Sequence, residues 1–147
     1  MSKRAVPYQT TIHIRDHCLC LHLQRAARTI GRRFDEALRA VGLTNGQFSL
    51  LMALNRPEAP TIGIVAETIG MDRTTLTAAL KPLERRGLVT VAADRDDRRA
   101  RRIALSEEGL ALLARAVPVW VETHAAIEAE VPGVDWDGMR GVLRGVT

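Results

Sequence analysis

Two short helical patterns joined by a glycine turn lie in the middle of this 147-residue chain, and they restrict its possible folds more than any other feature. Apolar residues recur at steps of three and four from Ile62 to Ile69, and Gly70 ends this pattern. Asp72 is a good N-cap for a second helix, which we expect over residues 73–86. Together the two patterns predict a helix-turn-helix arrangement.

A β-hairpin is expected directly after the helix pair. Alternating apolar residues predict short strands over residues 89–91 and 103–105. The loop between them, residues 94–102, is too charged to belong to a hydrophobic core and contains five arginines. An arginine-rich hairpin beside a helix-turn-helix has the shape of a wing.

Longer helical patterns precede this block. Apolar steps of three and four predict one helix over about residues 16–41, and Gly42 supplies its C-terminal stop. Thr44 and Gln47 form the sequence pattern of a capping box, which predicts a further helix to about residue 54.

The C-terminal part predicts a dimer interface. Ser106 caps a long helix whose apolar positions follow a heptad-like seam: Leu110, Leu113, Val117, Trp120, His124, Ile127 and Val131. A monomer of this size would leave the seam poorly covered, and an exposed apolar stripe marks an interface. The fold class is therefore mainly α with a small β-hairpin wing, a winged helix-turn-helix with N- and C-terminal dimerisation helices. We expect an N-terminal arm and first dimerisation helix (1–43), a winged helix-turn-helix domain (44–105) and C-terminal dimerisation helices (106–147).

The positive charge of the chain is concentrated in the central block. Residues 72–102 hold nine basic and five acidic residues, so this stretch carries the whole net charge of +4. A basic patch on a neutral body favours a polyanion partner, although a solvated charged face would have the same composition.

The exposed face of the second helix suits DNA recognition. The residues on this face are Arg73, Thr74, Thr75, Thr77 and Lys81. At the N-terminal end, arginine bonds guanine, and threonine offers a hydroxyl to a base or phosphate and a methyl group to thymine. Lys81 lies further along and is placed for a backbone phosphate. An arginine at the hairpin tip would enter the minor groove, and Asp97 is placed to hold it extended through an ion pair.

The same block resembles the MarR family of transcriptional regulators. Residues 71–77 (MDRTTLT) and 80–89 (LKPLERRGLV) are similar to that family's recognition helix and the entry to its wing. Asp94, residues 97–99 (DRR) and residues 105–109 (LSEEG) resemble its wing motif and the start of its long fifth helix.

This resemblance implies a homodimer that binds a pseudo-palindromic operator in double-stranded DNA, usually as a repressor released by a small ligand or an oxidant. By position, Arg99 matches the minor-groove arginine of the family's wing and Asp97 its ion-pair partner, with Arg98 beside them. Two alternatives stay open: a metal- or thiol-based sensor variant of the same regulator, and a winged-helix module that binds protein instead of DNA.

The N-terminal helix holds candidate sensing residues. On a continuous helix, His13, His17 and Cys20 share one face and resemble a three-ligand zinc or copper(I) site. Scattered histidines and a small buried cysteine explain the same residues, so we assign no metal and no cofactor. Cys18 or Cys20 also resembles, in placement, the reactive cysteine of the family's organic-peroxide sensors.

A small-molecule inducer is the third possibility that the resemblance implies. It would bind between the dimer helices and the wing domain, where Met52, Trp120 and His124 are the candidate lining residues. Trp120 and His124 would equally serve as packing residues on an apolar seam.

Several other classes of protein are not expected. The chain has no glycine-rich phosphate loop, no His-Glu-x-x-His pair and no Gly-x-Ser-x-Gly elbow, so we do not expect an enzyme. No apolar run approaches the ~20 residues that cross a bilayer, so we expect no membrane partner. Its two cysteines are too few for a disulfide framework and too close on a helix to bridge, which favours a cytoplasmic location.

Overall fold

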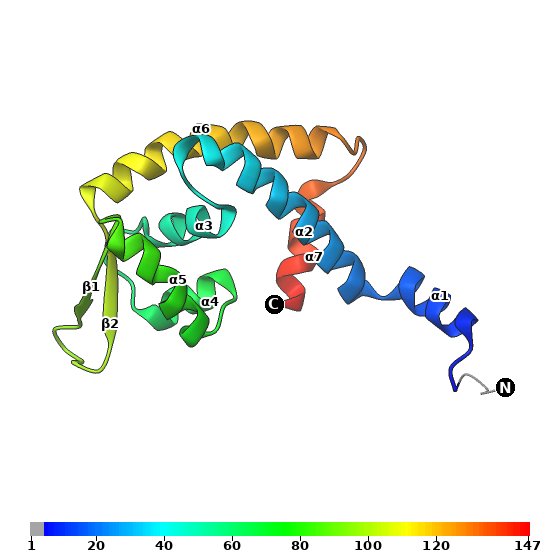
Figure 1. Ribbon diagram of the computed structural model, residues 1–147, viewed down its shortest axis with the longest axis horizontal. Coiled ribbons are helices and arrows are strands. Elements are labelled where there is room, and N and C mark those ends of the chain that lie inside the picture. The colour runs from blue at the N-terminus through cyan, green and yellow to red at the C-terminus, as the bar shows by residue number, and fades with distance from the viewer. Residues whose placement is uncertain (1–4) are drawn as a thin grey trace.

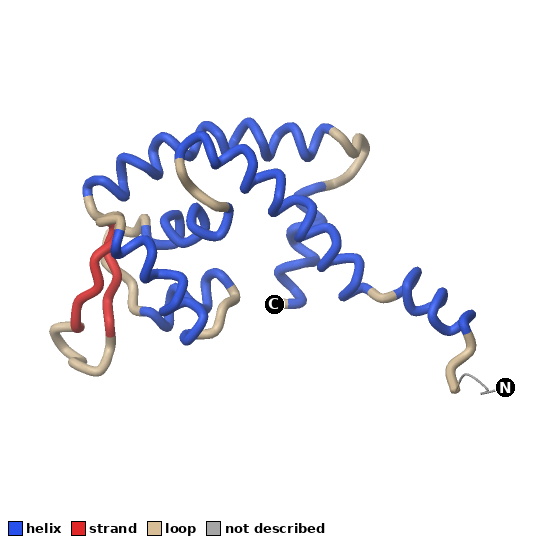
Figure 2. The backbone as a smooth tube through the Cα atoms, viewed as in Figure 1, coloured by secondary structure: helices blue, strands red, loops and turns tan. Residues whose placement is uncertain are grey.

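The computed structural model describes residues 5–147. The elements follow in the order α1 (Tyr8–His17), α2 (Leu19–Leu38), the 3-10 turn η1 (Arg39–Val41), α3 (Asn45–Leu54), α4 (Ile62–Ile69), α5 (Arg73–Arg85), β1 (Val89–Ala93), β2 (Arg101–Leu105), α6 (Glu107–Ala129) and α7 (Trp136–Val146). The long helix α6 runs along one edge of the molecule, the hairpin extends from its start, and α1 projects away from the body (Figure 1). Figure 2 shows that the hairpin is the strand component of an otherwise helical fold.

Helices start where the sequence places capping residues. Thr44 Oγ1 accepts the N–H of Gln47 at 3.1 Å, and Gln47 Oε1 accepts the N–H of Thr44 at 3.1 Å, so the predicted capping box begins α3. The side chains of Asp72 and Ser106 cap α5 and α6 through the third helical residue. Gly70 adopts φ 65°, the left-handed conformation that ends α4 and turns the chain into α5. The predicted helix-turn-helix and hairpin are confirmed.

The hydrophobic core lies between α3 and the elements around it. Its most deeply buried side chains are Leu38, Leu51, Val65, Leu76, Leu83, Val89 and Ile103. Because these residues come from α2, α3, α4, α5 and both strands, each element turns its apolar side toward one centre. Burying one such side chain stabilises the fold by about 1.5–3 kcal/mol. The core therefore holds the helix-turn-helix and the hairpin together as one body beneath α6.

The helix predicted over about residues 16–41 is confirmed from Leu19 to Val41 as α2 and η1, but its start is wrong, because α1 and α2 meet at Cys18. This residue has an extended backbone (φ −72°, ψ 106°), and its Sγ accepts the N–H of Leu21 at 3.4 Å as the N-cap of α2. The preceding helix, α1, buries none of its residues. Apolar periodicity reports burial, so a helix that buries nothing carries no such signal.

The heptad-like seam predicted on α6 is also divided between two faces. Leu113 is buried, whereas Leu110 and Val117 are 47% and 43% exposed. Leu112 and Ala116, outside the predicted seam, are buried instead. One side of α6 packs on α2 and α3, and a second apolar stripe is left uncovered. A single heptad pattern therefore merged an intrachain face with an exposed one.

Apolar side chains are exposed along three of the helices. They are Leu19, Leu23 and Ile30 of α2, Leu110, Val117 and Val121 of α6, and Met139, Val142, Leu143 and Val146 of α7. These are the segments predicted to dimerise, and such an exposed apolar surface needs a covering partner. By length and composition α6 also qualifies as a membrane-spanning helix, contrary to the sequence expectation. In the structure it packs against α2, α3 and β2.

Candidate nucleic-acid interface

Helix α5 separates a buried apolar stripe from an exposed polar face. Leu76, Leu80 and Leu83 are buried in the core. The predicted DNA-facing side chains, Arg73, Thr74, Thr75, Thr77 and Lys81, are all exposed. The helical period of the apolar residues thus leaves the polar N-terminal half of α5 accessible to a duplex.

The threonine hydroxyls of α5 are not equivalent. Thr75 donates its backbone N–H (2.8 Å) and its Oγ1 hydroxyl (2.6 Å) to the two carboxylate oxygens of Asp72. The Thr75 hydroxyl bond is the main reason why the pKa of Asp72 lies below its usual value. Thr77 Oγ1 donates to the carbonyl oxygen of Arg73 at 2.7 Å. No hydrogen bond within residues 5–147 engages the Thr74 hydroxyl.

These bonds narrow what each threonine offers to DNA. The hydroxyl protons of Thr75 and Thr77 are already engaged in hydrogen bonds within the protein, so these side chains present a methyl group and oxygen lone pairs to DNA. Lone pairs accept from base amino groups but form no hydrogen bond with phosphate, which has no donor. Of the two contacts expected for a threonine hydroxyl, a bond to phosphate is therefore open to Thr74, whereas Thr75 and Thr77 can offer an acceptor and a methyl group to a base.

The hairpin is fixed by a buried carboxylate that the sequence reasoning missed. Asp94 is 7% exposed, although its loop was expected to lie wholly outside the core. Its carboxylate accepts the N–H groups of Asp96 and Asp97 at 2.8 and 2.9 Å and a bond from Arg102 Nε. These bonds lower the pKa of Asp94 to about 2, and the bond from the Asp97 N–H contributes most.

Arg102 extends this connection to the helix-turn-helix. Its Nη1 donates to the carbonyl oxygen of Ala59, in the loop before α4, at 2.6 Å. One residue further along β2, the Ile103 N–H donates to the Pro60 carbonyl at 3.0 Å. The hairpin is therefore held against the start of α4 by both backbone and side-chain bonds. An alternating strand pattern does not reveal this role, because the acceptor lies 43 residues away.

The ion pair predicted between Asp97 and Arg99 does not form in the described part of the chain. Asp97 Oδ1 instead accepts the backbone N–H of Arg99 at 3.0 Å. Asp97 therefore shapes the turn, and the side-chain ion pair of the hairpin joins Asp94 to Arg102. The side chains of Arg98 and Arg99 remain exposed at the tip.

A hollow of about 490 Å³ lies between the start of α4, α5 and the hairpin. Arg73 and Thr77 line it from α5, and Arg99 and Arg101 line it from the hairpin. Arg73 is directed toward the start of α4, because a Cβ added at Gly63 would lie 3.0 Å from its Nη2 atom. The two predicted DNA-facing elements therefore border one cavity, to which Arg101 and Gly63 contribute without having been predicted.

The predicted metal ligands are not brought together. His13 and His17 stack with ring centroids 4.2 Å apart on α1, whereas Cys20 lies beyond the helix break on α2. Within residues 5–147 no group of three suitable side chains is placed to hold a metal ion.

The two cysteines have different surroundings. Cys18 is half-buried at the α1–α2 junction, and Cys20 is exposed, with its Sγ accepting from Gln24 Nε2 at 3.4 Å. The Arg15 guanidinium, three residues before Cys18 in the sequence, pairs with the Asp16 carboxylate at 2.6 Å.

The candidate inducer residues are mostly engaged in packing. Trp120 stacks on His124 with ring centroids 4.7 Å apart, and lies 6.4 Å from both Phe34 and Phe48. Met52 is 49% exposed on α3.

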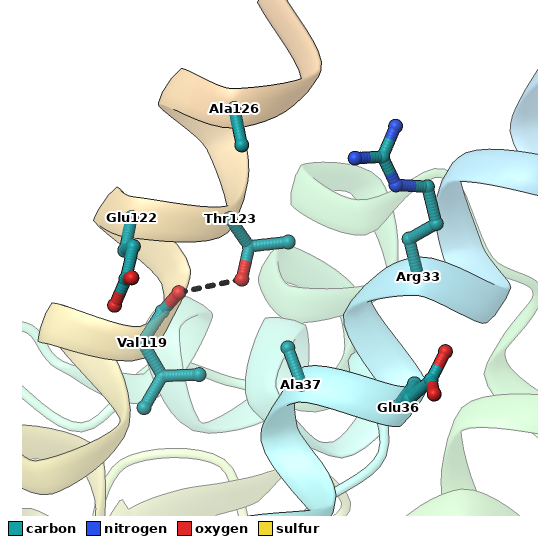
Figure 3. A pocket seen from close by; sticks show the side chains of 7 residues that line it. All are labelled: Arg33, Glu36, Ala37, Val119, Glu122, Thr123 and Ala126. Carbon is teal, nitrogen blue, oxygen red and sulfur yellow. Dashed lines mark hydrogen bonds between the residues drawn. The ribbon is translucent and has the colours of Figure 1, made fainter.

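A separate open hollow of about 460 Å³ lies between α2 and α6, and none of the three predicted residues lines it (Figure 3). At its rim, Arg33 forms a bidentate pair with Glu130, with both N–O distances 2.6 Å, which lowers the pKa of Glu130.

Comparisons with known proteins agree with this geometry. A family model described as MarR family matches residues 41–100. The organic hydroperoxide resistance transcriptional regulator of Bacillus subtilis is 31% identical over 101 residues, which make up 69% of each chain. Other curated relatives are matched over about half to two thirds of their own length.

Solved structures match over most of the chain. The M. tuberculosis transcriptional regulator MosR in complex with DNA has a TM-score of 0.80 at 41% identity, covering 88% of this chain and 93% of that one. CouR from Rhodococcus jostii, bound to p-coumaroyl-CoA, has a TM-score of 0.77 at 27% identity, with 89% and 92% covered.

Proposed function

The chain belongs to the MarR family of transcriptional regulators, and from this premise we propose that it binds a pseudo-palindromic operator as a homodimer and represses transcription there. It is a soluble DNA-binding regulator and not an enzyme. The main observation in support is that α5 and the hairpin line the same cavity. The helix that would enter a major groove therefore lies beside the hairpin that would reach a minor groove. We assign its place of action to the cytoplasm.

The predicted interface residues divide into three roles. Thr74, Thr75 and Thr77 face base edges in the major groove, and Lys81 contacts the backbone. At the hairpin tip, Arg98 and Arg99 approach the minor groove, whose narrow A·T-rich segments attract arginine. Asp97 supports this tip through the Arg99 N–H.

Residues 1–43 and 106–147 form the dimer platform in this proposal. The exposed apolar side chains of α2, α6 and α7 support it, because a second subunit would remove them from water. Residues 44–105 form the DNA-binding domain. Two-fold symmetry then presents two copies of α5 to half-sites about one DNA turn, ~34 Å, apart.

A gel-shift titration across salt concentrations tests the proposal. We expect a sharp complex of two subunits with selected duplex DNA, weakening steeply with salt because phosphate contacts release counterions. Arg99→Ala should weaken binding most on operators with A·T-rich flanks. Absence of DNA binding by a well-folded dimer would favour the protein-binding alternative.

A thiol-based switch at Cys18 is the second candidate. Its support is that the Cys18 Sγ caps α2 at the junction with α1, so oxidation there would disturb a helix start next to the dimer platform. The Bacillus subtilis relative is named for organic hydroperoxide resistance. We expect peroxide to reduce operator affinity in the wild type and in Cys20→Ser, but not in Cys18→Ser. Unchanged wild-type affinity would leave a small-molecule inducer, near Met52, Trp120 and His124, as the mode of regulation.

A further inference from the structure

We propose that the hollow between α4, α5 and the hairpin holds one phosphate group of the operator backbone, and that Arg73 and Arg101 are its ligands. Arg73 is thereby a phosphate contact and not the guanine-reading residue that its position at the front of α5 suggests. This inference rests on the proposed DNA binding and specifies which part of the duplex meets this cavity.

The direction of Arg73 is the first argument. Its guanidinium lies over the backbone of Gly63 at the start of α4, within 3.0 Å of where a Cβ would be. A methyl group at Gly63 would push the guanidinium aside by a few tenths of an ångström, so the glycine makes room for this orientation. Arg73 therefore lines the cavity beside α4, whereas Thr74, the next residue on α5, does not line it.

The charge of the cavity is the second argument. Three guanidinium groups line it, those of Arg73, Arg99 and Arg101, against the single lining carboxylate of Asp97. Within residues 5–147 none of these three arginines forms an ion pair. The first turn of α4 also borders the cavity, and a helix N-terminus adds positive potential. Unpaired guanidinium groups on the wall of one cavity fit the oxygens of a phosphate.

The place of the cavity identifies the source of that phosphate. It separates the helix that enters a major groove from the hairpin tip that reaches the adjacent minor groove. A DNA strand passing from one groove to the other crosses this gap with its sugar-phosphate backbone. A backbone phosphate is thus the anion brought to the cavity whenever both elements are engaged.

The salt dependence of DNA affinity distinguishes a phosphate contact by Arg73 and Arg101 from a contact with a base. With duplex DNA selected from random sequences by the wild type, Arg73→Ala and Arg101→Ala should each weaken binding by a similar factor on selected and unselected sequences. Each variant loses two phosphate contacts per dimer, so the ratio of wild-type to variant affinity should shrink about tenfold between 50 and 200 mM salt. Arg95→Ala, which removes one exposed hairpin arginine outside the cavity, is the matched control and should change the salt slope much less. A loss for Arg73→Ala confined to operators with one particular guanine would overturn the proposal.

Neutral phosphates locate the contact. Methylphosphonate is placed at each backbone position of the selected duplex in turn, and wild-type affinity is measured. One position per half-site should lose affinity in the wild type but cause no further loss in Arg73→Ala or Arg101→Ala. Additive losses at every position would refute a contact between these arginines and a particular phosphate, while leaving sequence-specific dimer binding intact.

Gly63→Ala tests the cavity without changing any charge. Alanine favours helix, so α4 should be retained. The added Cβ would stand 3.0 Å from the Arg73 Nη2 atom, so the guanidinium should shift by a few tenths of an ångström and the salt slope should fall part of the way toward that of Arg73→Ala. Wild-type affinity and slope in Gly63→Ala would count against the proposed orientation. Binding of inorganic phosphate to the DNA-bound dimer as tightly as to the free dimer would identify a separate anion site and overturn the assignment to DNA.

Discussion

Gly109 in the first turn of α6 is the position where one methyl group should cost most. A Cβ there would lie 2.1 Å from the carbonyl oxygen of Leu88 and 3.1 Å from its carbonyl carbon. Ordinary contact begins near 3.4 Å, so Gly109→Ala forces main-chain atoms apart by more than 1 Å. The Leu88 carbonyl is held in place, because it accepts the Ser106 N–H at 3.0 Å. We expect a loss of about 3 kcal/mol or more, the upper range for overpacking.

Urea denaturation at one fixed protein concentration measures this loss, since the stability of a dimer depends on concentration. Gly46→Ala is the matched control: Gly46 lies in the first turn of α3, and its nearest neighbour, Thr44 Oγ1, is 3.9 Å from an added Cβ. Alanine should leave stability there unchanged or raise it by up to about 1 kcal/mol through helix propensity. If Gly109→Ala stays within 1 kcal/mol of the wild type, the contact between α6 and Leu88 is not tight, and the reasoning fails.

Three further predictions concern the hairpin, α5 and the dimer. The pKa of Asp94 is about 2 in the folded chain, against about 3.9 for an unfolded aspartate. The ionised carboxylate therefore stabilises the fold fully above about pH 4, and this stabilisation is lost as the pH falls to 2. In an acid titration, the difference in stability between the wild type and Asp94→Asn should narrow over that interval. Thr74→Val should weaken operator binding without lowering the melting temperature, whereas Thr75→Val should lower both, because only the Thr75 hydroxyl donates to Asp72. Val142→Glu, at a side chain 70% exposed in the single chain, should raise the dimer dissociation constant in sedimentation equilibrium by about 100-fold or more, because two apolar contacts of about 1.5 kcal/mol each are lost.

Local signals predicted much of the fold. Thr44 with Gln47, Asp72 with Thr75, and Ser106 with Gly109 each lie three residues apart, so the donor and acceptor of every cap can be found from the sequence. The alternation in β1 and β2 also reports directly which side meets the core. Such features need no knowledge of the rest of the chain.

Contacts between residues far apart in the sequence, and burial that depends on a partner subunit, cannot be predicted from local sequence patterns. Arg102 contacts Ala59, which lies 43 residues away in the sequence, so nothing near Arg102 in the sequence marks it as a structural residue among the predicted DNA-binding arginines. The orientation of Arg73 depends in the same way on Gly63, which belongs to another helix. Asp97 was assigned an ion pair because charge pairing is easier to infer than a backbone bond within a turn.

The two ends of α6 connect the DNA-facing block to the dimer platform. At its start, Ser106 Oγ donates to the Gly87 carbonyl at 2.6 Å, just past the end of α5. Near its end, Glu130 pairs with Arg33 of α2. A helix of 23 residues is about 34 Å long, and packed helices move as units because close-packed interiors resist local deformation. If Cys18 is modified or a ligand binds as proposed, a displacement of α2 would reach α5 and the hairpin through these packed contacts. Because DNA fixes the separation of the two half-sites at about one turn, even a small movement of α6 changes how well both recognition helices fit at once.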